Sequence, residues 1–269
     1  MKGNTFFLGF GLLLACMFLS GSWSGTDVIP SGGIRTLVID AGHGGRDPGA
    51  LGRTHYEKDI ALGVALQVKR IMAREMPEIK VVLTRESDEF IELKERGEIA
   101  QAAGGDFFIS IHCNGLNDRR KAGTETYILG TNPGQESYDR IIAENQAILL
   151  EEDYRETYDN FNPNSPEGFI FFSLLKNAYR EESFRMAEKI QNRFETRLGR
   201  HNRGVKQAPF VVLYACGMPA VLTEIGFITN SQEEAYLASE AGQVQVATAI
   251  YRSVKEYNME LMTFNHPNK

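Results

Sequence analysis

Cysteine and net basic charge are both scarce in this sequence, and each shortage narrows the classes of protein to which it can belong. Only 3 of the 269 residues are cysteine and no Cys-x-x-Cys pair occurs, so a zinc site built on thiolates is excluded. Cys113 and Cys216 lie in apolar runs, where we expect buried free thiols rather than a disulfide. The chain has 29 basic and 35 acidic residues, which gives a net charge of −6. It therefore lacks the excess of positive charge that proteins use to bind nucleic acid.

A long apolar run occurs at the N-terminus. Lys2 precedes a stretch rich in Phe and Leu that ends in small residues near position 25, which is the pattern of a secretory signal peptide over residues 1–25. We therefore expect export to the periplasm or cell envelope, with residues 26–35 as a linker. Leu13 to Cys16 also fit a lipobox, so the sequence leaves open whether lipidation of Cys16 attaches the protein to a membrane.

From residue 36 onwards, segments with the period of strands alternate with segments of helical period. Strands are expected at residues 37–40, 80–84, 107–112, 124–129, 211–214 and 220–223. Helices are expected at residues 58–76, 91–103, 138–150, 184–198 and 231–257. This order predicts one α/β domain over residues 36–258, with a twisted, mostly parallel sheet flanked by helices, and a frayed tail at 259–269.

The first expected strand runs directly into a glycine-rich loop that carries His43. Five glycines lie between positions 42 and 52, and they let the backbone fold closely around whatever His43 binds. A histidine at the end of a strand in such a loop can ligate a metal, take part in catalysis or only cap a turn.

Three further titratable side chains fall where they can join His43. His112 and Glu224 follow two other expected strands, and Glu57 begins the helix after the first one. Sites in open α/β sheets gather outside the carboxyl ends of strands, so these four groups are expected at one edge. Two imidazoles and a carboxylate suit a catalytic Zn²⁺, and a second carboxylate could transfer protons. Chemistry alone does not decide whether Glu57 or Glu224 holds the metal.

Each of these residues also has a purely structural interpretation. His112 could be a core histidine, and Glu57 could be a favourable charge at a helix N-terminus. Glu224 is harder to explain in this way, because an acid that follows the apolar residues 220–222 is costly to bury unless it is paired.

Other polar residues are candidates for supporting roles. His55 is a reserve ligand, whereas His201 and His266 are expected on the surface. Three acids could orient a ligand: Asp40, Asp47 and Asp59. The candidates for contact with substrate or for support of the ligands are Arg85, Asn114 and Arg203.

The short motifs of the chain, taken together, resemble a known family. DAGHGGRDPGA, EKD, LTR, SIHCN, RGVK and MPAVLTEIGFITN occur in the order found in zinc-dependent N-acetylmuramoyl-L-alanine amidases, which include periplasmic cell-separation amidases. The resemblance covers residues 36–257. It implies Zn²⁺ on His43, Glu57 and His112, with Glu224 as the catalytic acid and base. It also implies hydrolysis of the amide between N-acetylmuramic acid and L-alanine in peptidoglycan.

Two other functions stay open beside this one: a zinc peptidase or aminoacylase acting on another amide, and an inactive peptidoglycan-binding protein. Residues 131–169 are a candidate regulatory insert, because some similar amidases close the zinc site with a glutamate until an activator protein displaces it. The acids in this interval are Glu144, Glu151, Glu152 and Glu156. A substrate-binding wall is the competing interpretation. We expect a monomer that finds peptidoglycan through its groove or through a partner.

Overall fold

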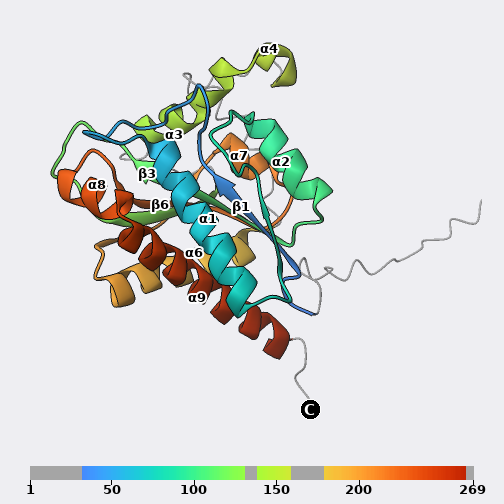
Figure 1. Ribbon diagram of the computed structural model, residues 1–269. Coiled ribbons are helices and arrows are strands. Elements are labelled where there is room, and N and C mark those ends of the chain that lie inside the picture. Colours follow the sequence, from blue (N-terminus) through green and yellow to red (C-terminus); the bar gives the residue numbers. More distant parts are fainter. Residues whose placement is uncertain (1–31, 131–137, 159–178, 265–269) are drawn as a thin grey trace, which may run out of the picture.

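Six strands form one sheet in the described part of the chain, which comprises residues 32–130, 138–158 and 179–264 of the computed structural model (Figure 1). The strands are β1 (Thr36–Ala41), β2 (Lys80–Leu83), β3 (Phe107–Asn114), β4 (Thr124–Leu129), β5 (Asn202–Ala208) and β6 (Ala220–Phe227). Their order across the sheet is β2-β1-β3-β6-β4-β5, and neighbours are parallel except β4 and β6. The predicted α/β fold with a mostly parallel sheet is confirmed.

Helices cover both faces of this sheet. One face carries α1 (Glu57–Glu75), α6 (Arg180–Leu198) and α9 (Glu240–Phe264), and the other carries α2 (Leu93–Ala102) and α7 (Val211–Ala215) (Figure 1). Successive strand residues point to opposite faces, so Leu37 and Ile39 belong to the core beneath α1 and α9, while Val38 belongs to the core beneath α7. The sheet therefore lies between two layers of helices.

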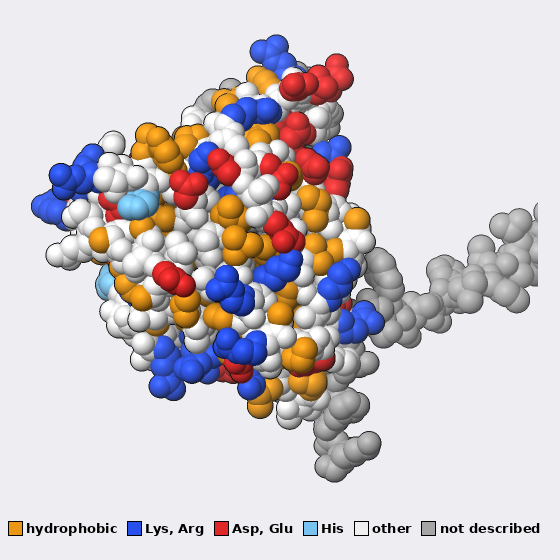
Figure 2. All heavy atoms as spheres, in the orientation of Figure 1, with side chains coloured by type: hydrophobic (Ala, Val, Ile, Leu, Met, Phe, Trp, Pro, Cys, Tyr) orange, Lys and Arg blue, Asp and Glu red, His pale blue; other side chains and the backbone are white. Residues whose placement is uncertain are grey.

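The remaining helical elements lie mainly near the edge where β1 and β3 end. They are α3 (Tyr138–Asn145), the 3₁₀ helix η2 (Gln146–Leu150), α4 (Tyr154–Thr157) and, after β6, α8 (Ser231–Ala238). Figure 1 shows α3 and α4 together at this end of the molecule. On the face shown in Figure 2, Lys and Arg predominate in the lower part, where α1 and α9 lie, so the surface charge is unevenly spread.

The helix α1 illustrates how the sequence encodes these elements. Ile60, Val64 and Val68 recur at helical spacing and are buried against the sheet. Two acids, Glu57 and Asp59, lie in its first turn, where negative charge interacts favourably with the helix dipole. The helix ends immediately before the turn that contains Pro77.

The predicted strand at 211–214 is wrong, because these residues form the helix α7. A short apolar run fits a buried strand or a buried helix equally well, and here the chain packs over the sheet, with Asn145 accepting a hydrogen bond from Val211 N at 3.0 Å. The edge strand is β5 instead, a half-buried and largely polar segment that hydrophobic periodicity does not detect.

The predicted frayed tail is also wrong in its first part, since α9 continues to Phe264. Asn258 is buried and its side chain accepts a hydrogen bond from Ile34 N at 2.7 Å, and Leu261 is buried as well. Contacts with the start of the domain thus hold a segment that looks polar and terminal in the sequence.

Several predictions fall outside the described residues: the signal peptide with Cys16, most of the linker, residues 131–137 and 159–169 of the insert, and His266. Among the described residues, no helix has both the length and the apolar character needed to cross a membrane. Cys113 and Cys216 are buried and unbridged, as predicted.

Candidate metal centre and active site

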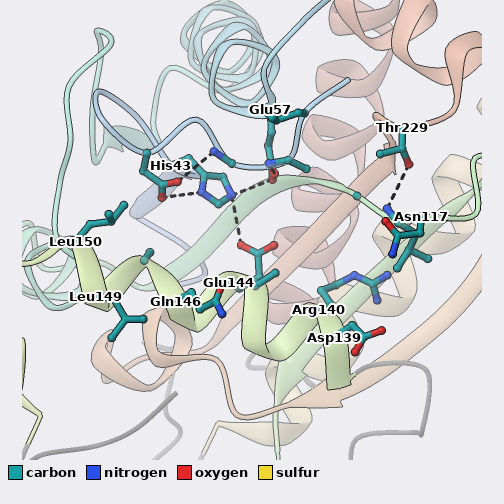
Figure 3. Close-up of a pocket in the computed structure, with 18 of the residues that line it drawn as sticks. His43, Glu57, Asn117, Asp139, Arg140, Glu144, Gln146, Leu149, Leu150 and Thr229 are labelled. Carbon is teal, nitrogen blue, oxygen red and sulfur yellow. Dashed lines mark hydrogen bonds and ion pairs between the residues drawn. The ribbon is translucent and has the colours of Figure 1, made fainter. Parts of the chain in front are cut away.

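Four side chains from distant parts of the chain converge at the edge where β1 and β3 end. They are His43, Glu57, His112 and Glu144, and one ligand atom from each lies within 4.8 Å of the others. Nε2 of His43 lies 3.2 Å from Oε1 of Glu57 and 3.4 Å from Oε2 of Glu144. Nδ1 of His112 lies 3.1 Å and 3.0 Å from the same two oxygens. In Figure 3, His43, Glu57 and Glu144 point toward one another.

The loop after β1 places His43 through an uncommon backbone conformation. His43 has a φ of 59°, in the left-handed region that side chains other than glycine rarely adopt. Glycine is required next to both rings, because a Cβ at Gly49 would lie 2.5 Å from Cδ2 of His43, and one at Gly42 would lie 2.4 Å from Cε1 of His112. The loop glycines thus allow close packing around the two imidazoles.

Hydrogen bonds orient the candidate ligands on the β1 loop and on α1. Asp47 lies 2.8 Å from Nδ1 of His43, which leaves Nε2 of that ring facing the cluster. Glu57 accepts hydrogen bonds from Ala50 N and from Cys113 N, both at 2.7 Å. Nε2 of His43 is buried and has no hydrogen-bond partner among the described residues.

The electrostatics of the cluster are those of paired imidazoles and carboxylates. Burial by itself lowers the pKa of His112, but Glu144 and Glu57 outweigh burial and raise that pKa to about 10. Burial would raise the pKa of the two acids, yet the imidazoles lower the pKa of Glu57 and bring that of Glu144 to about 2. A divalent cation, which binds ionised carboxylates and neutral imidazoles, would compete with these imidazole protons.

Glu224 lies beside this cluster on the neighbouring strand. It is the register partner of His112 in the parallel pair β3–β6, so both side chains point to the same face of the sheet. Its carboxylate is fully buried, and neither oxygen has a hydrogen-bond partner in the described part of the chain. Burial and the nearby Glu144 raise the pKa of Glu224 well above its ordinary value, although Arg140 opposes them.

The other predicted residues divide into supporting and distant ones. Arg85 is buried rather than exposed, and it donates hydrogen bonds to the carbonyls of Ala41 and Gly42 beneath the His43 loop. Asp40 is buried below the site and is bound by three donors, Thr84, Arg96 and Ser110. Three polar residues are exposed and lie outside the cluster: His55, Asp59 and His201.

The four acids of the insert have different positions. Glu144 joins the ligand cluster, whereas Glu151 is buried at a distance from it and accepts a hydrogen bond from Leu93 N at 2.9 Å. Glu152 and Glu156 are exposed. A cleft of about 960 Å³ opens beside the cluster, and α3 and η2 contribute Glu144, Leu149 and Leu150 to its wall (Figure 3).

Sequence reasoning missed a second charged group next to the cluster. Arg140 on α3 contacts Glu125 and Glu224, and Asn114 donates a hydrogen bond to Glu125 at 2.7 Å. Arg203 lies with its Nε 3.5 Å from Glu125. Glu125 is fully buried in β4 but lies between Thr124 and Thr126, so the sequence lacks the preceding apolar run that identified Glu224.

Known proteins are similar to this chain in sequence and in fold. The model of the N-acetylmuramoyl-L-alanine amidase family matches residues 37–256. The chain is 33% identical over 228 residues to the N-acetylmuramoyl-L-alanine amidase AmiA of Escherichia coli K12, an alignment that covers 84% of this chain and 77% of AmiA.

Solved structures agree with this result. The amidase AmiC2 of Nostoc punctiforme superposes with a TM-score of 0.60 at 28% identity, covering 82% of this chain and 96% of AmiC2. The CwlD amidase of Clostridioides difficile, solved in complex with the GerS lipoprotein, superposes with a TM-score of 0.60 at 25% identity, covering 83% of this chain and 98% of CwlD.

The fold, the buried cluster and these relatives define the chain as a hydrolase of amide bonds. It belongs to the N-acetylmuramoyl-L-alanine amidase family, whose substrate is peptidoglycan.

Proposed function

We propose that this protein is an exported zinc amidase that separates the stem peptide from N-acetylmuramic acid, in cell-wall remodelling or daughter-cell separation. His43, Glu57 and His112 would hold the metal, and Glu224 would transfer the protons. The observation that carries the metal assignment is the convergence of Nε2 of His43 and Nδ1 of His112 on Oε1 of Glu57. Export rests on the N-terminal sequence pattern.

The residues of the cluster fit zinc in chemistry and in spacing. Imidazole nitrogens and carboxylate oxygens are its ordinary ligands, and two ligands about 2.1 Å from a tetrahedral centre lie about 3.4 Å apart. The four nitrogen–oxygen distances of the cluster are 3.0 to 3.4 Å. Nε2 of His43, which is buried and makes no hydrogen bond within the described residues, is the atom through which this ring would bind the metal.

Bound zinc would polarise the amide carbonyl and activate water near neutral pH. Glu224 would accept one proton from the attacking water and donate a proton to the amide nitrogen as the carbon–nitrogen bond breaks. Glu224 must be ionised to accept the first proton. Burial and Glu144 raise its pKa in the closed form, and both the departure of Glu144 and the charge of a bound cation would lower it again. Asp47 and the backbone N–H groups of Ala50 and Cys113 would keep the metal ligands oriented.

Glu144 would keep the enzyme in a closed form. A fourth protein ligand fills the position that a catalytic zinc leaves open for water or substrate, so the carboxylate of Glu144 must leave before the reaction can occur. A partner that displaces α3 would then act as an activator. The complex of the similar CwlD amidase with a lipoprotein supports a search for such a partner.

Metal analysis combined with a muropeptide digest tests this proposal. We expect one zinc per chain and, by mass spectrometry, free stem peptides that begin with the amine of L-alanine. Glu144→Ala should digest muropeptides about tenfold faster than the wild type, whereas Glu152→Ala, a change at an exposed acid of the same insert, should have no effect.

Three outcomes would contradict the proposal. Cleavage only within the peptide would indicate a peptidase. Absence of cleavage by Glu144→Ala with zinc bound would indicate a binding protein. A slower Glu144→Ala enzyme with full zinc content would exclude the closed form.

A further inference from the structure

Arg140 fills an acidic pocket next to the ligand cluster. It precedes Glu144 by one helical turn on α3, and its side chain is 5% exposed. Nη1 of Arg140 lies 2.5 Å from Oε1 of Glu125, and Nε lies 3.6 Å from Oε1 of Glu224. The guanidinium also donates hydrogen bonds to Oδ1 of Asn114 and to the hydroxyl of Tyr127.

The two acids of this pocket depend on Arg140 to different degrees. Oε2 of Glu125 accepts a hydrogen bond from Lys206 and lies 3.5 Å from Nε of Arg203, so one side of this carboxylate is satisfied from β5. Oε1 of Glu125 faces Arg140 and the amide of Asn114, and Glu224 accepts no hydrogen bond from the described residues. Buried carboxylates are costly without a cation nearby, and Arg140 brings its charge to Oε1 of both acids.

The proposed reaction produces a cation at this position. Hydrolysis breaks the carbon–nitrogen bond, transfers the oxygen of water to the carbonyl carbon and leaves the nitrogen as the primary amine of alanine, which is an ammonium group at neutral pH. If Glu224 gives a proton to this nitrogen, the nitrogen must lie within hydrogen-bond reach of Glu224. It would then lie at the edge of the pocket that Arg140 occupies.

We propose that Glu125 and Glu224, with Asn114 and Tyr127, form a cation-binding subsite, which Arg140 fills in the closed form and a primary ammonium group of the stem peptide fills in the open form. The proposal rests on the proposed function for the position of the leaving nitrogen. Two opposite charges then hold α3 in place, Glu144 at the ligand cluster and Arg140 at this subsite. The amine of the peptide competes with Arg140, and therefore opposes closure.

Binding of three peptides to the full chain with its metal, measured by calorimetry, tests the subsite. The first begins with a free L-alanine amine and has no side-chain amine. The second is its N-acetylated form, and the third is N-acetylated but carries one lysine. None contains the bond to N-acetylmuramic acid, so binding is measured without turnover.

We expect Arg140→Met to bind the free-amine peptide about tenfold more tightly than the wild type, because the competing cation is removed. Glu125→Gln in the same background should abolish this gain. Arg155→Met, at an exposed arginine of the insert, and Arg140→Lys, which keeps the charge, should bind like the wild type. Tighter binding of the first peptide assigns the subsite to the alanine amine, and tighter binding of the third assigns it to a side-chain amine.

Equal affinity of Arg140→Met for all three peptides would overturn the proposal. If Arg140→Met does not fold, hydrogen exchange of wild-type residues 138–150 gives the same decision. The free-amine peptide or the lysine peptide should then speed exchange in this segment and the N-acetylated peptide without lysine should not. Equal exchange with all three would overturn the subsite. Failure to bind zinc or to cleave muropeptides would contradict the proposed function instead.

Discussion

Two walls meet at the candidate site, and they are built differently. The first carries His43, Glu57 and His112 on or next to β1, α1 and β3, whose backbones belong to the sheet or to a helix packed on it. The second is the segment α3–η2, which carries Arg140 and Glu144 and has no part in the sheet. Side chains such as Asn145, hydrogen-bonded to Val211 N and Pro209 O, connect this segment to the rest of the protein.

This difference matches the proposed function, in which the first wall binds the metal and the second controls access to it. The first wall cannot move without breaking the sheet, so its ligands are held in place before a metal binds. The second wall can leave by breaking side-chain contacts, including the packing of Ile141 and Ile148, since the backbone hydrogen bonds of a helix lie within the helix itself. The predictions below test whether the two walls have these separate roles, beginning with the largest expected effect.

Removal of an imidazole from the first wall should abolish both metal binding and activity. We expect His112→Ala to lose its zinc and its muropeptide cleavage together, because one imidazole with carboxylates is a much weaker set of ligands for zinc than two imidazoles with a carboxylate. His201→Ala, at an exposed histidine, is the matched control and should behave like the wild type. Full zinc content in His112→Ala, measured by plasma mass spectrometry, would refute the ligand assignment.

Glu224→Gln should separate catalysis from metal binding. The amide has the shape of the acid but cannot transfer the proton, so we expect about a 10³-fold loss of turnover. Zinc content and melting temperature should stay close to those of the wild type, because Glu224 is not among the ligand atoms of the cluster. A variant that retains wild-type turnover would exclude Glu224 as the acid and base.

Asp47→Asn should weaken metal binding by the first wall without abolishing it. The carboxylate of Asp47 lies 2.8 Å from Nδ1 of His43, and loss of such a partner typically lowers metal affinity about 10- to 100-fold. Competition with a chelator measures this change. Asp59→Asn, at an exposed acid of α1, is the control. Equal zinc affinity of the two variants would exclude an orienting role for Asp47.

The smallest effect is expected at Glu151, which helps hold the second wall. Burial raises its pKa from 4.5 to about 7, and Glu92 adds to this effect, although the hydrogen bonds from Leu93 N and Tyr158 and the charge of Arg96 oppose it. The docked segment therefore binds a proton that the undocked chain releases above about pH 4.5. Docking should weaken as the pH rises from about 4.5 to about 7 and change little above that.

Hydrogen exchange of residues 146–158 at pH 6 and pH 8 measures this dependence. Compared with Glu151→Gln, which has no titrating group at this position, the wild type should lose protection at the higher pH. An identical pH response of the two proteins would show that Glu151 does not control docking. Glu144 cannot cause the effect, since its pKa of about 2 keeps it ionised throughout this range.

Much of the fold could be predicted from the sequence because its signals are local. The β1 run, the helical spacing of α1 and the alternation of β4 each specify one element, and the structure contains all three. Failures occurred where local patterns are ambiguous. The apolar run at 211–214 became a helix because of what it packs against, and β5 is a polar edge strand whose identity comes from pairing with β4.

The candidate site likewise has residues that the sequence could predict and residues that it could not. His43, Glu57, His112 and Glu224 could be named because strand ends in a parallel sheet meet at one edge. Arg85 could not be assigned, since its burial depends on carbonyl groups that the folded loop presents to it. The four acids of the insert could not be ranked, because helical spacing does not say where the helix docks.

The sequence by itself determined the mostly parallel sheet, the protein family and the four titratable groups, because these follow from hydrophobic period, glycine placement and motif order. Only the tertiary structure decided that Glu144 joins two imidazoles and that Arg140 enters the pocket of Glu125 and Glu224. The reason is physical: a charge can be buried only where opposite charges or hydrogen-bond donors from other segments compensate it, and no segment carries that information alone.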